Sequence, residues 1–446
     1  MVPLEGKRVV VVGLGASGVA AARLCASRGA KVVANDRKPL EAWGPEARAL
    51  EQAGVKLVAG GHERAGLSSA DLVVVSPGVP PFPELEAADR AGVRIWGEVE
   101  LATRLLRHPA PIVAVGGTNG KSTTTSLVGA LLEAQELQTF TGGNLGEPLA
   151  SHADERFEAI VLEVSSFQME RVDEFHPRSS ILLNITEDHL DRYPDLAAYA
   201  RAKGNSFARQ TPEDVAVVPV GDDLCHLQAQ RGRGRIVTFG PGGDFDVTPD
   251  AIVDRARSEY YARSELALVG GHNASNAAAA LAAVTPFGVE PDAVRRVFQT
   301  FRGLPHRMAL VAEIDGVRYY DDSKGTNVGA VVTALEGLAE AKAVLIAGGR
   351  DKEGSYTPLV QALRTKGRAA VLIGEAAERI AHAIGDAIPV HHAKTLDEAV
   401  RASAKLAYPG DAVLLSPACS SYDMFRDYKH RGDEFVRSVK LLEGVS

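Results

Sequence analysis

A glycine-rich turn followed by Lys121 and Ser122 is the strongest chemical signal in this sequence. The segment 112–131, IVAVGGTNGKSTTTSLVGAL, reads as a short apolar strand, a turn, and a helix that begins near Lys121. Backbone N–H groups at the positive end of a helix bind phosphate. The Lys121 ammonium can reach the β- and γ-phosphates of a nucleotide, and the Ser122 hydroxyl can bind Mg²⁺. The standard P-loop spacing fails because residue 115 is valine, and an ordinary packing turn is the competing interpretation.

Three further polar clusters follow predicted strands in the central part of the chain. Asn144 lies in the glycine-rich segment 139–146 and could hold a substrate or a phosphate. Glu163 ends an apolar stretch, where a carboxylate suits a Mg²⁺ ligand or a water-orienting residue. His189 follows a strand that ends near Asn184. A glycine turn, a structural glutamate and a structural histidine are the respective alternatives that the spacing leaves open.

Two asparagines and a lysine complete the central candidates. Asn273 and Asn276 lie three residues apart at the start of an alanine-rich helix. Two amides on one face of a helix N-terminus could read the edge of an adenine, although N-capping explains one of them equally well. Lys203 lies on a predicted helix, and its surroundings in the sequence indicate only an exposed lysine without a role.

A second glycine-rich turn, GLGASG, lies within the strand–turn–helix pattern of residues 7–29. Gly13, Gly15 and Gly18 match G-x-G-x-x-G, and the next strand ends on Asp36, where an acidic residue normally binds a ribose hydroxyl. These features alone indicate NAD. The same geometry binds any diphosphate at a helix N-terminus, including that of a UDP-sugar, and a tight packing turn is a further alternative.

Polar residues also follow predicted strands in both flanking parts of the chain. Ser76 and Gly78 come after an apolar strand near the N-terminus, and similar clusters occupy 321–324, 348–352 and 416–422 near the C-terminus. Parallel strands place their carboxyl ends at one edge of a sheet, where ligands bind. These segments therefore predict ligand-binding edges, although a plain Pro-Gly turn explains Ser76 and Gly78 equally well.

Length and composition set limits on the class of protein. The chain has 446 residues, 45% of them hydrophobic and 24% charged, with a net charge of −8; this charge argues against nucleic-acid binding. Cys25, Cys225 and Cys419 lie far apart, which excludes a disulfide framework and fits a reducing cytoplasm. The N-terminus lacks a signal-peptide pattern, and no apolar run approaches the length of a membrane span. We expect a cytoplasmic protein that does not insert into membranes.

The alternation of strands and helices predicts an α/β protein with three domains. We expect a Rossmann-like domain over residues 1–98, a P-loop ATP-binding domain over 99–303 and a second Rossmann-like domain over 304–446. The segment FRGLPHR at 301–307 reads as a linker. Two nucleotide-type folds on either side of a P-loop domain indicate that several substrates are brought together.

These motifs resemble the Mur ligases of bacterial cell-wall synthesis. GTNGKS at 117–122 is similar to the variant P-loop of that family, which folylpolyglutamate synthases share. LPHR at 304–307, DDSKGTN at 321–327 and SPACSSYDMF at 416–425 resemble the branch that adds D-glutamate. The resemblance covers all three predicted domains. It implies that the N-terminal glycine turn binds the UDP-sugar substrate and not NAD.

The resemblance implies an ATP-dependent acid–amino-acid ligase of peptidoglycan precursor synthesis. Such an enzyme adds D-glutamate to UDP-N-acetylmuramoyl-L-alanine through an acyl phosphate and releases ADP. The implied cofactors are ATP and Mg²⁺, with Lys203 carbamylated so that it becomes an anionic oxygen ligand for a second Mg²⁺. The implied partners are these small molecules alone, bound by a monomer whose C-terminal domain closes over the P-loop.

The resemblance also implies a role for each candidate residue. The residues expected to carry catalysis are Lys121, Glu163, His189, Lys203 and Arg307. The expected metal ligands are Ser122, Glu163, His189 and Lys203. The expected ATP-binding residues are Gly117, Thr118, Asn119, Gly120, Lys121, Ser122, Thr123, Asn273, Asn276, Arg307 and Asp322. The expected UDP-sugar contacts are Gly15, Ser17, Asp36, Arg37, Ser76, Gly78 and Asn144. The expected D-glutamate contacts are Lys324, Thr326, Ser421 and Tyr422.

Four residues depart from the family pattern or stay outside the predicted site. Arg37 directly follows Asp36, where a small polar residue is expected first. Asp351 and Lys352 are adjacent in the glycine loop GGRDKEG, and we leave both out of the site. Cys419 is interpreted as a packing residue, because the reaction needs no protein nucleophile. The rival functions are another amide ligase such as a folylpolyglutamate synthase, an NAD-dependent enzyme with an ATPase module, and a non-catalytic nucleotide-binding protein.

Overall fold

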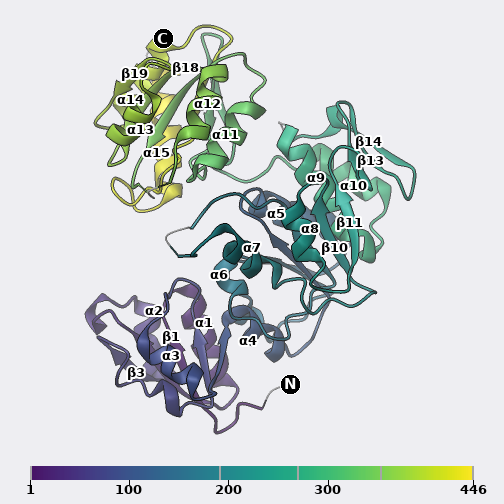
Figure 1. The fold of residues 1–446 in the computed structure, drawn as a ribbon, viewed down its shortest axis with the longest axis vertical. Coiled ribbons are helices and arrows are strands. Elements are labelled where there is room, and N and C mark those ends of the chain that lie inside the picture. Colours follow the sequence, from purple (N-terminus) through teal and green to yellow (C-terminus); the bar gives the residue numbers. More distant parts are fainter. Residues whose placement is uncertain (1–2, 190–191, 269–270, 352–353, 444–446) are drawn as a thin grey trace. The chain divides into compact units, whose positions relative to one another are not determined.

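The computed structural model describes residues 3–189, 192–268, 271–351 and 354–443. These residues form three α/β modules, each built around one β-sheet, which we call the N-terminal, central and C-terminal modules (Figure 1). The predicted α/β class is therefore confirmed. Lys352 of the glycine loop lies outside the described residues.

The N-terminal module contains a five-stranded parallel sheet with the order β3-β2-β1-β4-β5. Its strands are β1 (Arg8–Val12), β2 (Lys31–Asp36), β3 (Lys56–Ala59), β4 (Leu72–Val75) and β5 (Arg94–Gly97). Its helices are α1 (Ala16–Ser27), α2 (Pro45–Arg48), α3 (Pro83–Arg90) and α4 (Glu98–Leu105). The valine run of β1 is buried on both faces, as expected for a central parallel strand. Strand order reverses beside β1, so the loops after β1 and β4 meet at the ligand edge.

The central module contains a nine-stranded sheet with the order β14-β13-β12-β11-β10-β9-β6-β8-β7. Its strands are β6 (Ile112–Gly116), β7 (Thr139–Gly143), β8 (Ala159–Glu163), β9 (Ser179–Leu182), β10 (Val215–Pro219), β11 (Arg235–Phe239), β12 (Phe245–Val247), β13 (Ala251–Asp254) and β14 (Glu259–Ala262). Its helices are α5 (Lys121–Ala134), α6 (Ser166–Met169), α7 (Leu196–Gly204), α8 (Asp223–Ala229), α9 (Gly271–Val284) and α10 (Pro291–Thr300). Strand β6 lies between β8 and β9 and is fully buried, which places its loop beside the ends of both neighbours.

The C-terminal module contains a six-stranded sheet with the order β15-β16-β20-β17-β18-β19. Its strands are β15 (Ala309–Ile314), β16 (Val317–Asp321), β17 (Ala343–Gly348), β18 (Gly367–Ile373), β19 (Val390–His392) and β20 (Ala412–Leu415). Its helices are α11 (Val328–Gly337), α12 (Thr357–Lys366), α13 (Ala377–Ile384), α14 (Leu396–Leu406) and α15 (Tyr428–Glu443). Helices α11 to α13 cover one face and α14 and α15 the other. The predicted strands are present, and the antiparallel edge strand β15 is an addition.

Residue contacts divide the chain into two units. The first unit holds the N-terminal and central modules, and the second holds the C-terminal module with residues 186–188 and 267–274. Within the first unit, one apolar cluster runs from Val11 of β1 through Leu101 of α4 to Leu162 of β8. Shared burial of this kind makes the two modules a single packed body.

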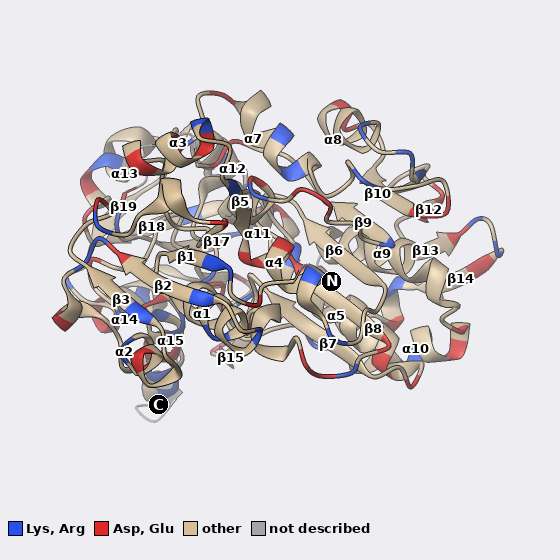
Figure 2. Ribbon diagram, turned by 90° about the horizontal axis from the view of Figure 1, so that it is seen from below, with Lys and Arg blue, Asp and Glu red and all other residues tan. Residues whose placement is uncertain are grey.

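Three bulk features complete the description. Segments with Lys and Arg alternate with segments rich in Asp and Glu along the ribbon (Figure 2). All three cysteines are buried and free of disulfides. Among the helices of the described residues, none combines the length and the hydropathy that a membrane crossing requires.

Candidate active site

The loop between β6 and α5 has a backbone that only glycine adopts easily. Gly117 has a φ of 139° and Gly120 a φ of 84°, both in the region that L-residues rarely occupy. Asn184, just after β9, accepts hydrogen bonds at Oδ1 from the N–H groups of Thr118 (3.2 Å) and Asn119 (2.9 Å). Its own amide donates to the Asn119 carbonyl at 3.1 Å. Asn184, for which the sequence predicts only the end of a strand, therefore holds the loop in shape.

Two ammonium groups converge on this loop. Lys121 Nζ donates to the carbonyl oxygens of Gly117 (3.0 Å) and Thr118 (2.7 Å). Lys203 Nζ donates to the same Gly117 oxygen at 2.7 Å and lies 4.4 Å from the centre of the Tyr199 ring. Lys203 is buried, not exposed as the sequence around it indicated. Two cations at one glycine-rich turn create a site for an anion.

A serine, a glutamate and an asparagine meet beside the same loop. The Ser122 hydroxyl donates to Glu163 Oε2, and the Asn144 amide donates to Glu163 Oε1 at 2.5 Å. Ser122 and Glu163 are both buried. These oxygen atoms are the hard ligands that Mg²⁺ prefers. The described ranges contain no group of three or more His, Cys, Asp and Glu side chains arranged to hold a metal. A Mg²⁺ ion here would have the Glu163 carboxylate and the Ser122 hydroxyl as its protein ligands. So few protein ligands are typical of a Mg²⁺ ion that also binds phosphates.

His189 packs against aromatic rings of α6 and α7, and Asn276 lies beside the glycine-rich loop. The His189 ring lies 4.8 Å from the ring of Phe167 and 6.3 Å from that of Tyr199, measured between centroids. His189 also has a left-handed backbone with φ 55°. A Cβ atom added to Gly120 would lie 2.6 Å from Asn276 Oδ1, so this amide is in contact with the phosphate loop. Asn273 is buried in the first turn of α9.

The N-terminal glycine turn is held by two of its predicted ligand residues. Asp36 Oδ2 accepts from the Leu14 N–H at 3.0 Å, and Ser76 Oγ donates to the Gly13 carbonyl at 2.7 Å. A Cβ atom at Gly18 would lie 1.8 Å from the same carbonyl oxygen, so this position requires glycine. The remaining candidates lie around the turn at partly or fully exposed positions: Gly15, Ser17, Arg37 and Gly78.

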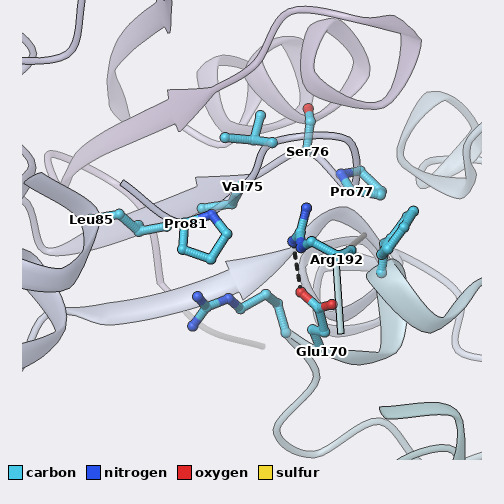
Figure 3. Close-up of a pocket in the computed structure, with 10 residues that line it drawn as sticks. Val75, Ser76, Pro77, Pro81, Leu85, Glu170 and Arg192 are labelled. Atoms are coloured by element: carbon cyan, nitrogen blue, oxygen red, sulfur yellow. Dashed lines mark hydrogen bonds and ion pairs between the residues drawn. The ribbon is translucent and has the colours of Figure 1, made fainter. Parts of the chain in front are cut away.

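A pocket within the first unit opens between the loop after β4 and helix α6 (Figure 3). Arg192 pairs with Glu170 at 3.0 Å, and its guanidinium lies 5.0 Å from the centre of the Phe167 ring. The Tyr193 hydroxyl donates to the other Glu170 oxygen at 2.6 Å. The pocket is bordered by Ser76, which holds the glycine turn, and by Phe167, which contacts His189. Its lining therefore includes Ser76, a predicted UDP-sugar residue, and Phe167, a neighbour of the predicted metal ligand His189.

Asp322 is a buried carboxyl at the end of β16 in the C-terminal module. The Ser416 hydroxyl donates to its Oδ2 at 2.7 Å. Burial raises the pKa of Asp322 to about 7, and the hydrogen bond from Ser416 and the charge of Arg307 oppose that rise. The structure thus brings Asp322, Arg307 and Ser416 together, as expected from the polar clusters that follow β16 and β20.

The predicted D-glutamate residues differ in their surroundings. Lys324 Nζ lies 4.1 Å from the centre of the Tyr428 ring, and the Thr326 N–H donates to the Lys324 carbonyl at 2.8 Å. Ser421 is buried at the start of a turn. Tyr422 is 68% exposed, and the aromatic ring beside Lys324 belongs to Tyr428. The contact of Tyr422 with D-glutamate stays a prediction, and the Tyr428 ring beside Lys324 is a neighbour that the motifs did not indicate.

Arg431 is a fully buried arginine that the motifs did not indicate. It donates to the hydroxyl (3.0 Å) and the carbonyl (2.8 Å) of Ser323 and to the Cys419 carbonyl (3.3 Å). Burial lowers its pKa to about 10. These bonds tie the loop after β16 to the loop after β20. An arginine on an amphipathic helix gives no local sequence signal for such a role.

Three family models match successive parts of the chain. The Mur ligase MurD-like N-terminal domain matches residues 7–97, the Mur ligase middle domain matches 115–284, and the Mur ligase glutamate ligase domain matches 306–419. Together these matches cover all three modules.

Curated relatives and solved structures agree with these matches. The UDP-N-acetylmuramoylalanine–D-glutamate ligase of Trichlorobacter lovleyi is 44% identical over 98% of this chain and 100% of its own length. That of Anaeromyxobacter dehalogenans is 47% identical over 97% of both chains. The MurF ligase of Thermotoga maritima, solved in complex with ADP, matches with a TM-score of 0.62 at 18% identity over 99% of this chain and 100% of that one. At that identity the last comparison supports the fold alone.

Proposed function

This chain belongs to the Mur ligase family, and we propose that it uses ATP to join D-glutamate to UDP-N-acetylmuramoyl-L-alanine. The observation that carries the proposal is the convergence of Lys121, Lys203, Ser122 and Glu163 on one glycine-rich loop. The full-length relatives named for this reaction support the choice of substrates. Because these substrates are intracellular metabolites, we expect the enzyme to act in the cytoplasm, and sedimentation should show a monomer.

The reaction requires activation of a carboxylate. Transfer of the γ-phosphoryl group of ATP to the substrate carboxylate yields an acyl phosphate, which has a good leaving group. The D-glutamate amine attacks the acyl carbon, and the tetrahedral intermediate collapses to amide and phosphate. In the proposed mechanism Lys121 and Arg307 balance the charge on the phosphoryl oxygens, and no protein nucleophile takes part.

Ser122 and Glu163 would hold one Mg²⁺ ion, and its chemistry is to neutralise phosphate charge. The Ser122 hydroxyl already donates a hydrogen bond to Glu163, so the two oxygen atoms are close enough to bind one ion together. Asn144 orients the other Glu163 oxygen. From this position Asn144 could also contact the substrate end that carries the reacting carboxylate.

We infer a second role for Lys203 through carbamylation. As an ammonium group it donates to Gly117 and cannot bind a cation. Reaction of its neutral amine with carbon dioxide would form an N–C bond and release one proton, giving an anionic oxygen ligand that, with His189, could hold a second Mg²⁺. The Lys203→Ala variant should be inactive and partly rescued by short carboxylic acids. Full activity without them would exclude the carbamate.

The substrates should bind at the loops of the flanking modules. The UDP-sugar diphosphate fits the N-terminus of α1 beside Gly15 and Ser17, with the nucleoside near Asp36 and Arg37. In the C-terminal module Lys324 is suited to pair with a carboxylate of D-glutamate, and the Ser421 hydroxyl adds a hydrogen bond.

The deciding experiment measures phosphate release from ATP and Mg²⁺ with UDP-N-acetylmuramoyl-L-alanine, with and without D-glutamate. Turnover should require both substrates and should fail with L-glutamate, lysine or diaminopimelate. Turnover with a different amino acid would keep the ligase chemistry and contradict the roles of Lys324 and Ser421. The absence of turnover with any of these pairs would contradict the proposal and direct attention to a folate-type ligase.

A further inference from the structure

Four side chains of the C-terminal module that have no assigned role form one connected chain of interactions. Arg379 of α13 pairs with Asp351, in the loop after β17, at 2.5 Å. The Tyr356 hydroxyl donates to the other oxygen of Asp351 at 3.0 Å and lies 3.3 Å from Cys419 Sγ, in the loop after β20. We call these four residues the Tyr356 network. It joins two loops and two helix ends at the ligand edge of one sheet.

The direction of the hydrogen bonds follows from the chemistry of the groups. The Asp351 carboxylate can only accept hydrogen bonds, so the Tyr356 hydroxyl donates its one proton to Asp351. The Cys419 thiol must then donate to the tyrosine oxygen. Tyr356 and Cys419 are both buried, and burial raises the pKa of the tyrosine hydroxyl, so it stays protonated. The Tyr356 hydroxyl keeps both hydrogen bonds, as donor to Asp351 and as acceptor from Cys419, only while these two residues keep their positions.

Cys419 belongs to the loop 416–421, which ends at the predicted substrate residue Ser421. Its neighbour Ala418 has a φ of 60°, a left-handed conformation that a residue with a Cβ keeps only when its surroundings fix it. The backbone of this loop is anchored to Gly325 through the Ala418 N–H (2.9 Å) and to Arg350 through the Ser420 carbonyl (2.9 Å). The thiol bond to Tyr356 is a side-chain anchor between these two backbone anchors, and Arg431 holds the Cys419 carbonyl from the other side of the residue.

We propose that the Tyr356 network is a positioning device that sets the loop 416–421 so that the Ser421 hydroxyl meets the amino-acid substrate. The inference rests on the proposed function, which assigns Ser421 to D-glutamate. Tyr356 acts through Cys419 and does not touch the substrate. Loss of its hydroxyl removes the acceptor of the thiol and one donor of Asp351, which loosens the loop next to Ser421. The predicted ATP and UDP-sugar residues of the N-terminal and central modules do not depend on these bonds. Asp322, a predicted ATP residue of this module, is held by Ser416 at the other end of the loop 416–421.

The test is a steady-state comparison of Tyr356→Phe with the wild type, using phosphate release in the full-length enzyme. Loss of one buried hydrogen bond corresponds to about a fivefold change in binding. We expect the KM for D-glutamate to rise by about fivefold, with kcat changed less than twofold and the KM values for ATP and the UDP-sugar unchanged. A rise in the D-glutamate KM alone would distinguish a positioning role from a general loss of folding, which would affect all three substrates.

Tyr320→Phe is a matched control in the same module. The Tyr320 hydroxyl is also buried and also donates to a carboxylate, that of Glu340, at 3.0 Å, and Glu340 in turn pairs with Arg318. This control loses an equivalent hydrogen bond away from the loop 416–421. We expect it to lower the unfolding temperature about as much as Tyr356→Phe while leaving all three KM values unchanged.

Variants of Cys419, the other partner in the bond with Tyr356, provide a second test. Cys419→Ala should reproduce the rise in the D-glutamate KM, and Cys419→Ser, which keeps a donor, should restore much of the affinity. The double variant of Cys419→Ala with Tyr356→Phe should be no worse than Tyr356→Phe alone, because Tyr356→Phe already removes the bond to Cys419. Independent, additive effects would contradict a shared bond.

The outcomes separate this inference from the proposed function. If the wild type releases phosphate with D-glutamate but Tyr356→Phe leaves its KM unchanged, or raises every KM equally, the positioning role is wrong and the ligase assignment stands. If the wild type does not use D-glutamate at all, the proposed function fails, and the role of the network toward that substrate fails with it.

Discussion

At the scale of the residue, burial decides what a charged side chain can do. Lys203 is buried and shares the Gly117 carbonyl with Lys121, although its helix reads as an ordinary exposed one. Two like charges at one acceptor repel each other unless an anion arrives between them. A phosphate bound at Lys121, or the proposed carbamylation of Lys203, would relieve this repulsion, so each lysine should matter for turnover.

Lys121→Ala should abolish turnover at the phosphate loop. The Lys121 ammonium is the positive charge that the glycine-rich loop itself supplies. Loss of one charged group that stabilises a phosphoryl-transfer transition state reduces kcat by roughly a hundredfold or more. The measurement is phosphate release with both substrates. Lys342→Ala is the control, because Lys342 also donates to a backbone carbonyl, that of Thr365, but lies outside the candidate site. Unchanged turnover in Lys121→Ala would contradict the P-loop assignment.

Glu98 should make the stability of the first unit depend on pH. Its Oε1 accepts from the Ala150 N–H at 2.8 Å, and within the described part of the chain Oε2 has no hydrogen-bond partner. Burial raises the pKa of Glu98 from 4.5 to about 7. The folded state therefore favours the protonated form. This stabilisation is complete below pH 4.5 and is lost as the pH rises through 7.

Glu98→Gln should remove this dependence, because the amide stays neutral and keeps an acceptor for Ala150. The shift corresponds to about 3 kcal/mol, so the variant should be more stable than the wild type by up to that amount at pH 8 and similar to it at pH 5. Urea unfolding followed at several pH values measures the difference. A wild-type and a variant curve that stay parallel from pH 5 to pH 8 would contradict the raised pKa.

At the scale of the element, the strand order brings distant loops together. Strand β6 lies between β8 and β9, so Lys121, Glu163 and Asn184 all follow neighbouring strands. In the C-terminal sheet β20 lies between β16 and β17, which gathers their three loops at one edge. Parallel strands place all these loops at carboxyl ends, where open sheets bind ligands.

Gly18→Ala should disrupt the N-terminal glycine turn. The new methyl group would lie 1.8 Å from the Gly13 carbonyl oxygen, so the turn must move away from α1. We expect the KM for the UDP-sugar to rise at least tenfold, since a misplaced turn loses its N–H contacts to a diphosphate. Kinetic titration of that substrate is the measurement.

Gly15→Ala is the matched control for the stability of the turn, because a Cβ atom there meets nothing within 4 Å. It should unfold at nearly the wild-type temperature, whereas Gly18→Ala should unfold earlier. Equal unfolding temperatures for both variants would show that the turn tolerates a side chain at either position.

At the scale of the whole molecule, the chain consists of two units with separate cores. The apolar cluster shared by the N-terminal and central modules lies in the first unit, and the two faces of the third sheet have their own clusters. In the first unit the fully buried Glu100 accepts from the N–H groups of Asp173 and Glu174 and pairs with Arg104, which adds a polar bond between helix α4 and the central module. Each unit should therefore unfold cooperatively by itself.

Unfolding in urea should resolve the two units. Both tryptophans, Trp43 and Trp96, are buried in the first unit, so tryptophan fluorescence reports on that unit alone. Far-ultraviolet circular dichroism reports on the whole chain. We expect a single fluorescence transition and a circular-dichroism curve with an additional transition at a different urea concentration. Coincident curves from the two probes would contradict independent units.

The sequence alone determined the fold class, the family and the candidate residues. Glycines with special backbone needs, strand–turn–helix periodicity and motifs such as GTNGKS are local, and local patterns are visible in a linear chain. The glycine-rich loop after β6, the helix that begins at Lys121 and the predicted strands of the third module all occur as expected. The family resemblance drawn from these motifs is confirmed by the family models and the full-length relatives.

The tertiary structure decided which of these residues meet, because such contacts join segments far apart in the chain. Only the fold shows that Lys203 reaches Gly117 and that Asn184 holds the phosphate loop. It also shows that the Tyr428 ring lies beside Lys324. Burial depends on packing from all sides, so neither the raised pKa of Glu98 nor the Tyr356–Cys419 contact has a signal in the sequence.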